Sequence, residues 1–435
     1  MLPYPTKFFD LKPFKQKEFD YYISKPDKWA VLFEVSWKNL RLKNPDATPV
    51  PYLSTSKCNP LVFHQPKQNA TKGKTTYKKA LQVDNGRILS CAYLSTIITE
   101  CDYEIIKNQY TWEEEKITRV KVSKKKMIPK ELRNQIMEFY MKKTTLKQDE
   151  DSPDFDEDIA YNYARSKELL NGIYGMHVTN PCKADYTFDN NTHEVLENQR
   201  DESVLLEEYY NSYSSFLSYQ VGIWVTSYAR KWLQEGIDAC YNPNTKMSDL
   251  IYCDTDSCKY MNPDLHEAAF EAINEKRKAL AEKTGAYVDY NGKRYHLGIF
   301  TTEPMAITMK TFGAKKYMYS YIKKEKDGSE HEDFKITISG VPKKQGKKCI
   351  EDAISKGRIK NPFDIKKGFV FHSIKTTSCY MNHQELKEFE VDGKKVYYAS
   401  NVAMYPNSYT LGLTYAFEIL LDKFKDIMEV EVNYE

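Results

Sequence analysis

The stretch Ile251-Tyr252-Cys253-Asp254-Thr255-Asp256-Ser257 carries two aspartates one residue apart, directly after a short apolar run. A second extended run, residues 259–261, follows, so we interpret the stretch as the turn of a β-hairpin. Since side chains in a strand alternate with a period of two, Asp254 and Asp256 should point the same way and converge on one pair of cations. Magnesium is usually held by one or two carboxylates together with substrate phosphates. The hairpin therefore predicts a magnesium site, although a bare D-x-D is also typical of a solvated acidic turn.

The composition limits the class of protein. The 435 residues are too many for one compact core, so about two to four lobes are expected. Lys and Arg total 64 against 61 acidic residues, a net charge of +3, which gives no general sign of a nucleic-acid partner. The 34 tyrosines are unusual, because a flat ring with a polar tip suits a surface that contacts bases or sugars.

Cysteine usage and hydropathy indicate the compartment. The nine cysteines include no C-x-x-C pair, and their odd number and irregular spacing fit neither a disulfide framework nor a zinc site. The N-terminal residues 1–5 lack a basic segment with an apolar core, and no run of about 18 apolar residues occurs. We therefore expect a soluble, cytoplasmic protein without a signal peptide and without membrane contact.

Two helices precede the hairpin, and the second carries a distinctive face. The first helix is expected over residues 128–147, with Pro129 in its first turn and a basic end. The second, over residues 158–174, aligns a cation, an amide and an aromatic ring at i, i+4 and i+7. These three residues are Lys167, Asn171 and Tyr174, and the opposite packing face is expected to hold Leu169, Leu170 and Ile173. Such a stripe suits a triphosphate and a base, but it is also typical of an ordinary amphipathic helix.

The remaining segments divide the chain. Residues 1–30 show no clear period and are expected to lead into the fold rather than to begin it. Strand-like alternation predicts a β-rich module over residues 30–120, and a polar inserted subdomain is expected over residues 176–216. Long helices are expected over residues 218–241 and 265–283. The last hundred residues, with a run of lysines near position 345, are expected to form a separate lobe.

Taken in this order, the stretches resemble the polymerase half of a family B DNA polymerase, most closely its protein-primed branch from bacteriophages and linear plasmids. The family signature Y-x-D-T-D-S is matched by residues 252–257. The signature K-x-x-x-N-S-x-Y-G is matched by residues 167–175, with Gly172 in place of the serine. A lysine-tyrosine signature is matched by Lys316 and Tyr317. Four further stretches resemble the protein-primed branch, namely residues 1–4, 101–110, 143–145 and 222–230.

The resemblance implies DNA-templated DNA synthesis, in which a dNTP is transferred to a primer 3′ hydroxyl by two-metal-ion catalysis. Asp254 and Asp256 would be the catalytic ligands of two Mg²⁺ ions, for which Mn²⁺ can substitute. The nucleotide-binding residues that it implies are Lys143, Lys167, Asn171 and Tyr174. The DNA-binding residues that it implies are Tyr252, Thr255, Lys315, Lys316, Tyr317, Lys343, Lys344, Lys347 and Lys348.

The resemblance also implies an α+β fold with palm, fingers and thumb and with two inserted subdomains. Residues 1–125 would enter the palm and include a first, β-rich insertion that contacts a priming protein and the template. Residues 126–175 would be the fingers, 176–217 a divergent second insertion linked to strand displacement and processivity, 218–330 the palm with the catalytic hairpin, and 331–435 the thumb. The implied partners are primer-template DNA, dNTP and a terminal priming protein, in the cytoplasm of a phage-infected cell.

One part of the family pattern is absent from these residues. The first signature, D-x-x-S-L-Y-P, supplies a further metal-binding aspartate in the family, and it does not occur in the sequence; nor is a proofreading exonuclease domain expected. Three interpretations stay open. The chain is one subunit of a split polymerase whose second polypeptide carries the exonuclease domain and the first motif, or it is a catalytically incomplete fragment. In the third interpretation it is a polymerase-derived, DNA-binding accessory protein.

Overall fold

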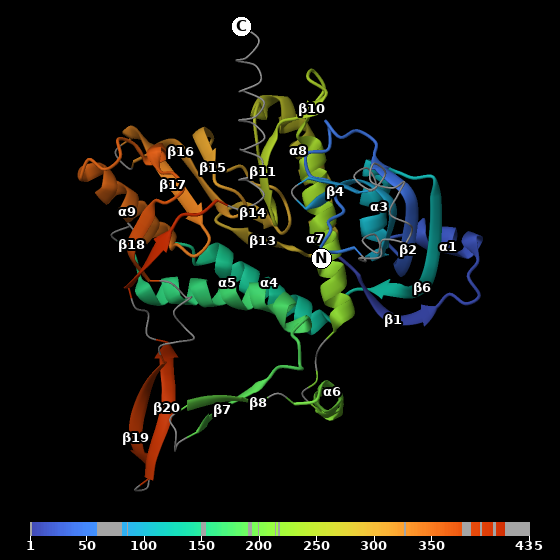
Figure 1. Ribbon diagram of the computed structural model, residues 1–435, viewed down its shortest axis with the longest axis horizontal. Helices are drawn as coiled ribbons and strands as arrows, with labels where there is room; N and C mark the ends of the chain where they lie inside the picture. The colour runs from blue at the N-terminus through green and yellow to red at the C-terminus, as the bar shows by residue number, and fades with distance from the viewer. Residues whose placement is uncertain are drawn as a thin grey trace, which may run out of the picture. The chain divides into compact units, whose positions relative to one another are not determined.

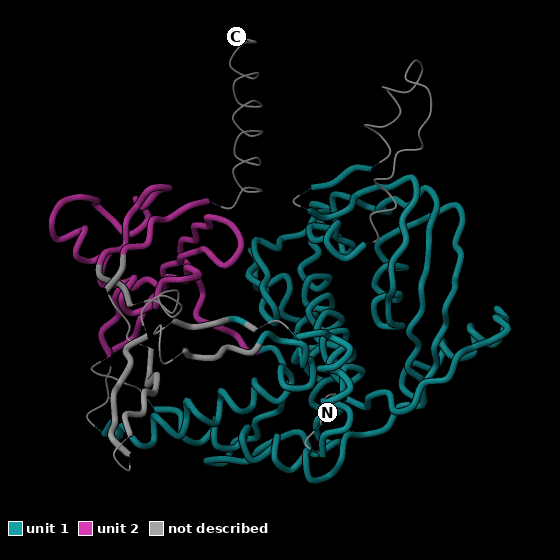
Figure 2. The backbone as a smooth tube through the Cα atoms, turned by 60° about the horizontal axis from the view of Figure 1, so that its bottom comes forward, with its two compact units in different colours: residues 1–187, 196–300 teal, residues 188–195, 301–435 magenta. Residues whose placement is uncertain are grey.

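The computed structural model describes residues 2–58, 81–84, 86–148, 154–189, 194–198, 200–213, 215, 218–325, 328–375, 384–391, 394–402 and 406–413. The described chain is a mixed α+β protein, as expected. It divides into two units, which Figure 2 colours separately: residues 1–187 with 196–300, and residues 188–195 with 301–435. Parts of the expected second insertion and thumb, including residues 414–435, lie outside the described residues. Within these ranges no helix is long and apolar enough to cross a membrane.

The first unit contains an antiparallel six-stranded sheet (Figure 1). Its strand order is β1-β6-β2-β4-β3, and the short β5 pairs with β2. The strands are β1 (Tyr4–Asp10), β2 (Trp29–Leu42), β3 (Leu81–Asp84), β4 (Arg87–Thr99), β5 (Tyr110–Thr111) and β6 (Glu114–Lys126). Val31, Phe33, Val35 and Trp37 of β2 are fully buried, and this period of two places them on the face covered by α1 (Gln16–Ile23) and α3 (Glu100–Gln109).

Residues 4–10 form strand β1 of this sheet, and residues 16–23 form α1, which packs on it, so the expectation that residues 1–30 only lead into the fold was wrong. Strand β1 pairs with β6, with Pro5 opposite Lys125. Phe19 of α1 is 1% exposed, and its ring packs edge-on against Phe33 at a centroid distance of 5.0 Å. The partners of β1 lie more than a hundred residues later in the chain, so no local pattern shows the pairing.

The four helices that the sequence predicts are present in the first unit. They are α4 (Lys130–Thr145), α5 (Glu157–His177), α7 (Tyr219–Ala239) and α8 (Pro263–Thr284). A shorter helix, α6 (Glu202–Asn211), lies within the expected second insertion. Helix α7 packs against β1, α3, α5, α8 and the hairpin strand β12. Its Trp224 is fully buried and donates its indole N–H to Glu100 Oε1 at 2.8 Å. Glu100 in turn forms a buried ion pair with Lys125 of β6 at 2.7 Å, so α7 is joined to the sheet through one carboxylate.

Short antiparallel ribbons complete the first unit. They are β9 (Tyr241–Asn242) with β10 (Met247–Ser248), β11 (Leu250–Asp254) with β12 (Ser257–Tyr260), and β13 (Tyr287–Tyr290) with β14 (Lys293–His296). A further ribbon pairs β7 (Asp185–Asp189) with β8 (Glu194–Asn198), and it has residues in both units, since residues 188–195 belong to the second. The predicted carboxylate hairpin is therefore present as β11–β12.

The second unit has its own core. A three-stranded sheet of β15 (Ala306–Thr311), β16 (Lys316–Lys324) and β17 (Glu330–Ile338) is covered by α9 (Lys343–Ser355). Its remaining elements are the 3₁₀ turn η2 (Pro362–Asp364) and the ribbons β18 (Val370–Lys375) with β21 (Pro406–Thr410) and β19 (Gln384–Val391) with β20 (Lys394–Val402). Met318, Ile350 and Phe371 are fully buried in this core.

The N-terminal segment should contribute to stability as a core element. We expect Phe19→Ala to lower the free energy of unfolding by about 3–5 kcal/mol, because a large buried ring is replaced by a cavity. Phe9→Ala is the matched control, since Phe9 is 44% exposed, and it should cost less than about 1 kcal/mol. Urea denaturation followed by circular dichroism measures both, and equal effects would contradict the place assigned to α1.

Candidate metal and nucleotide sites

The tip of the β11–β12 hairpin is a tight and strained turn. Asp254 pairs with Ser257, and the Asp256 N–H donates to the Asp254 carbonyl at 2.6 Å. Between them, Thr255 has a φ of +54°. A hydrogen bond from residue i+2 to residue i around a positive φ is the rare, strained form of the γ-turn, and a β-branched residue adopts positive φ at a cost. Backbone strain of this kind is found mostly at functional sites.

The turn changes how the two aspartates lie. Asp254 is the last residue of β11, whereas Asp256 lies in the turn itself. The alternation of side chains along one strand therefore does not apply to this pair, and the derivation of a common direction from the strand period was wrong. Asp256 is exposed, and the Asp254 carboxylate accepts the Thr255 hydroxyl at 3.0 Å. Tyr252, two pairs below the tip and opposite Lys259, is half-buried.

A buried carboxylate, Asp249, anchors the base of the hairpin. It immediately precedes β11 and accepts the Asn242 amide at 3.0 Å, the Asn262 amide at 2.9 Å and His266 Nε2 at 2.9 Å. Its own N–H donates to the Cys240 carbonyl, and its carbonyl accepts the Met261 N–H. The hydrogen bond from Asn262, followed by those from His266 and Asn242, holds the pKa of Asp249 below its usual value against the opposing effect of burial.

Helix α7 packs closely against the hairpin at a glycine, Gly236. A Cβ placed on Gly236 would lie 2.7 Å from Phe300 Cζ and 3.2 Å from Cys258 Sγ. Glycine is therefore the residue that fits this position without displacing its neighbours. Cys253 and Cys258 are cross-strand neighbours directly below the tip. Burial raises the pKa of the Cys253 thiol to about 11, so this thiol is protonated at neutral pH.

The residues at the tip offer carboxylate oxygens to a metal ion. Two carboxylates fit magnesium, which commonly completes its coordination with water and substrate phosphates. Within the described ranges, no group of three or more histidine, cysteine, aspartate or glutamate side chains is arranged to hold a metal. The tip therefore offers two carboxylates, Asp254 and Asp256, which fit part of a magnesium coordination shell.

The predicted nucleotide-binding stripe lies on the outer face of α5. Lys167 and Asn171 are exposed, and Tyr174 is 37% exposed. The expected packing face was partly wrong, because Leu169 is 42% exposed, while Leu170 and Ile173 are half-buried. Lys143, the other predicted nucleotide ligand, is half-buried in the last turn of α4, which packs against α5.

A glycine of α7 lies against the end of this stripe. A Cβ on Gly222 would lie 2.0 Å from Val178 Cγ1 and 3.8 Å from Tyr174 Cε2. The absence of a side chain at position 222 therefore lets the C-terminal end of α5, with Tyr174, pack closely on α7.

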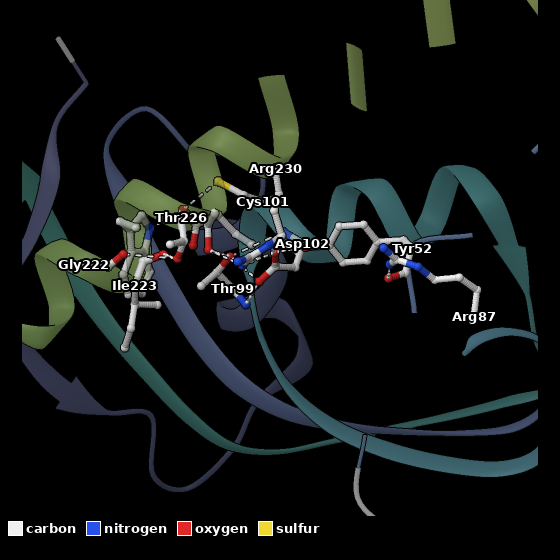
Figure 3. Close-up of polar contacts among 12 residues, drawn as sticks. Tyr52, Arg87, Thr99, Cys101, Asp102, Gly222, Ile223, Thr226 and Arg230 are labelled. Carbon is white, nitrogen blue, oxygen red and sulfur yellow. Dashed lines mark hydrogen bonds and ion pairs between the residues drawn. The ribbon is translucent and has the colours of Figure 1, made fainter. Parts of the chain in front are cut away.

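A polar network joins α3, α7 and the loop at Tyr52 (Figure 3). Asp102 caps α3 with Thr99 and accepts the Tyr52 hydroxyl. The Arg230 guanidinium of α7 donates to Asp102 Oδ1 at 2.8 Å and to the Tyr52 oxygen at 2.7 Å. Burial and the Asp102 charge raise the pKa of the Tyr52 hydroxyl, which therefore stays protonated. Asp102 thus fixes α7 to the sheet module, as Glu100 does. The sequence analysis matched the stretches 101–110 and 222–230 to the protein-primed branch, but it assigned no role to Asp102 or Arg230.

Three predicted DNA-binding residues, Lys315, Lys316 and Tyr317, lie at the start of β16 in the second unit. Lys315 is exposed and has a φ of +57°, in the turn that leads into the strand. Lys316 is half-buried, and its ammonium donates to the Gly412 carbonyl at 2.8 Å. The ring of Tyr317 stacks on that of Tyr319 at a centroid distance of 6.4 Å. Lys316 thus has a structural partner in this unit.

The predicted lysine cluster lies on α9. Lys343, Lys344 and Lys348 are exposed, and the helix packs on its sheet through Gly346, Ile350 and Ala353. Lys347 differs from the others, because its ammonium forms an ion pair with Asp333 of β17 at 2.6 Å. Two of the exposed lysines lie in the first turn, where the helix dipole also favours an anion such as a phosphate.

Comparison with known proteins gives similarity to solved structures only. No family model matches the chain, and no curated protein matches it. Phi29 DNA polymerase complexed with primer-template DNA is similar at 17% identity and a TM-score of 0.48, over 94% of this chain and 54% of that chain. Its ternary complex with primer-template DNA and incoming nucleotide substrates is similar at 16% identity and a TM-score of 0.46. These are similarities of fold alone. The chain spans about half of the length of the polymerases that it matches.

The lowered pKa of Asp249 gives stability a defined dependence on pH. Because the folded-state pKa lies below the unfolded value of about 3.9, the contribution of Asp249 is fully present above that value and is lost as pH falls through the folded pKa. The difference in unfolding free energy between the parent and Asp249→Asn should therefore shrink on acidification from pH 6 to about pH 3. Urea denaturation across that range measures it, and a difference independent of pH would contradict an ionised Asp249.

The close approach at Gly236 should make it intolerant of a side chain. We expect Gly236→Ala to lower the free energy of unfolding by about 1–3 kcal/mol through overpacking against Phe300 and Cys258. Gly172→Ala is the matched control, since nothing lies within 4 Å of a Cβ there and alanine favours a helix interior by about 0.5–1 kcal/mol. Denaturation should therefore give changes of opposite sign; a stabilising Gly236→Ala would refute the packing described.

Proposed function

We propose that this chain takes part in DNA-templated DNA synthesis, as the palm, fingers and thumb of a protein-primed family B DNA polymerase. The main support is the tip of the β11–β12 hairpin. The tip is strained at Thr255, and it carries Asp254 and Asp256 of the sequence Y-x-D-T-D-S. A solvated acidic turn needs neither the positive φ of Thr255 nor a base fixed by a buried carboxylate. The exposed stripe of α5 and the lysines of α9 add surfaces suited to a triphosphate and to DNA.

In this proposal the hairpin tip holds the metal ions. Asp254 and Asp256 would hold Mg²⁺, or Mn²⁺ in its place. Two such ions activate a primer 3′ hydroxyl and stabilise the departing pyrophosphate. The contribution of this chain is positional, because phosphoryl transfer depends mainly on alignment and charge stabilisation. The further carboxylate of the family site belongs to the signature D-x-x-S-L-Y-P, which these 435 residues do not contain. We therefore propose that the active form includes a polypeptide segment with that signature.

The nucleotide would lie against the fingers. Lys167 and Lys143 supply positive charge to its phosphates, as compact ammonium groups do well. Tyr174, supported from behind by α7 at Gly222, offers a ring face to the nascent base pair, and Asn171 shapes the pocket. Residues 1–125 and 176–217 would be the two insertions, in contact with a priming protein, the template and the displaced strand.

The remaining residues would bind DNA. Tyr252 and Thr255 lie at the hairpin next to the primer end, and Lys315, Lys316 and Tyr317 would hold the primer strand. Lys343, Lys344 and Lys348 would contact duplex phosphates from the thumb. Since Lys347 is paired with Asp333, its contribution to phosphate binding should be smaller than that of the exposed lysines.

A second candidate function is DNA binding without chemistry. It is favoured by the exposed lysines Lys343, Lys344 and Lys348, which give α9 a basic face that needs no metal ion to contact DNA phosphates. Under this alternative the chain binds duplex DNA as an accessory protein, and Asp254 has no role in its activity.

Primer extension separates the two candidates. We expect magnesium-dependent extension when the chain is joined to, or co-expressed with, a segment that carries D-x-x-S-L-Y-P. Asp254→Asn should reduce the rate by more than about 100-fold, because changes even in the outer shell of a metal site cost about 10- to 100-fold. Asp289→Asn, which removes an exposed carboxylate paired with Arg294, is the matched control and should retain the rate.

The segment can be supplied in two ways, joined to the chain or co-expressed as a separate polypeptide. Asp254-dependent extension with either one supports the polymerase, and the way that works identifies the source of the segment. DNA binding without extension in both arrangements favours the accessory protein. Extension by the chain without the segment would contradict the proposal of a shared metal site.

The salt dependence of DNA binding tests the lysines of α9. Each phosphate contact contributes about 0.9 to the slope of log affinity against log salt concentration. We expect Lys343→Ala to reduce that slope by about 1, and Lys347→Ala to reduce it by less, because Asp333 already neutralises Lys347. Fluorescence anisotropy with a labelled duplex between about 50 and 200 mM salt measures both. A larger effect of Lys347→Ala would contradict the assigned roles.

A further inference from the structure

We infer that Asp249 is a positioning residue for the metal site: its buried carboxylate sets the direction in which the hairpin presents Asp254 and Asp256. This inference rests on the proposed function and assigns a role to a residue outside the Y-x-D-T-D-S signature. Asp249 is 5% exposed and lies at the base of the hairpin, away from the tip. It therefore acts through the backbone and touches neither substrate nor metal.

The network converges on Asp249 from three segments. Asn242 ends the short strand β9 after α7, Asn262 follows β12, and His266 lies in the first turns of α8. All three donate to the Asp249 carboxylate at distances of 2.9 to 3.2 Å. Both ends of the hairpin are therefore tied to one side chain, since Asp249 precedes β11 and Asn262 follows β12. The His266 ring is also held edge-on against Tyr260 of β12 at 5.5 Å.

The hairpin needs such an anchor because it has little support of its own. Among the described strands, β11 and β12 pair only with each other, and the register shifts between Leu250 and Tyr252. A two-stranded ribbon is marginally stable by itself, so its direction depends on the contacts that hold it. Along the ribbon, α7 packs against it at Gly236, where a Cβ would approach Cys258 Sγ to 3.2 Å. At the end away from the tip, the ribbon is held by Asp249 and its donors.

Geometry explains why a distant residue matters. Asp254 lies five positions after Asp249, about 16 Å along an extended strand. A tilt of about 10° at the base would then move the tip by about 3 Å, whereas functional groups must be held within about 0.5 Å. Hydrogen bonds to an ionised carboxylate are directional and strong, which apolar packing is not. Burying a carboxylate has a desolvation cost that an apolar residue at the same position would avoid. The directional hydrogen bonds of Asp249 offset that cost.

Binding of Mn²⁺ to the purified 435-residue chain, followed by electron paramagnetic resonance, tests the inference without requiring catalysis. We expect Asp249→Asn to raise the Mn²⁺ dissociation constant about tenfold, as changes in residues that orient metal ligands do. Asn262→Gly should raise it by a smaller factor. This second variant removes one donor while glycine keeps the left-handed backbone of residue 262, whose φ is +53°, so it guards against a failure of Asp249→Asn to fold.

Controls separate positioning from general stability. Phe19→Ala weakens the core of the sheet and should leave the dissociation constant unchanged, as should the exposed Asp289→Asn. In an Asp254→Asn background, Asp249→Asn should have no further effect on Mn²⁺ binding. A change caused equally by Phe19→Ala would show that Asp249 acts only through stability and would overturn the inference.

The result also distinguishes this inference from the proposed function. Absence of Asp254-dependent Mn²⁺ binding in the parent chain would overturn the proposed metal site, and the inference with it. Intact binding in the parent, with an unchanged dissociation constant in folded Asp249→Asn and Asn262→Gly, would overturn the inference alone.

Discussion

The close packing of α7 is the constraint on which the first unit depends. One end of the helix is joined to the sheet by the indole of Trp224, which donates to Glu100 inside a buried ion pair with Lys125. Removing one partner of such a pair leaves an uncompensated charge in the interior and is strongly destabilising. The other end approaches the hairpin so closely that position 236 has no room for a side chain. The place of the aspartates therefore follows from the place of the helix.

The hairpin combines a strained tip with a rigid base. Thr255 holds a positive φ, and this strain persists only where surrounding contacts fix the chain. Asp249 and its three donors supply those contacts at the base. The tip remains accessible, since Thr255 and Asp256 are exposed. Such an arrangement is typical of a site that must present charged groups in one direction before its ligand arrives.

Local sequence patterns predicted the elements whose signals are local. The hairpin and the helices α4, α5, α7 and α8 occur where turn residues and helical periods placed them. The strand β1 was missed, because its hydrogen-bond partners in β6 lie more than a hundred residues away. Leu169 was wrongly placed in a packing face, since the period of a helix does not say which neighbours cover it.

The candidate site was predictable in part for the same reason. Asp254, Asp256 and the α5 stripe stand in recognisable spacings, whereas Asp249 resembles any aspartate before a strand. Only the folded chain brings Asn242, Asn262 and His266 onto its carboxylate. The ion pair of Lys347 with Asp333 is likewise a tertiary contact, and it distinguishes this lysine from neighbours that look the same in the sequence.

The proposed metal site requires that the carboxylates of the hairpin tip bind a divalent metal ion. Anomalous diffraction from crystals of the 435-residue chain grown with Mn²⁺ measures this most directly. We expect an anomalous peak within coordinating distance of the Asp254 and Asp256 carboxylates, and the loss of that peak in Asp254→Asn crystals. A parent structure in which Mn²⁺ binds at other residues, with both carboxylates facing solvent, would contradict it.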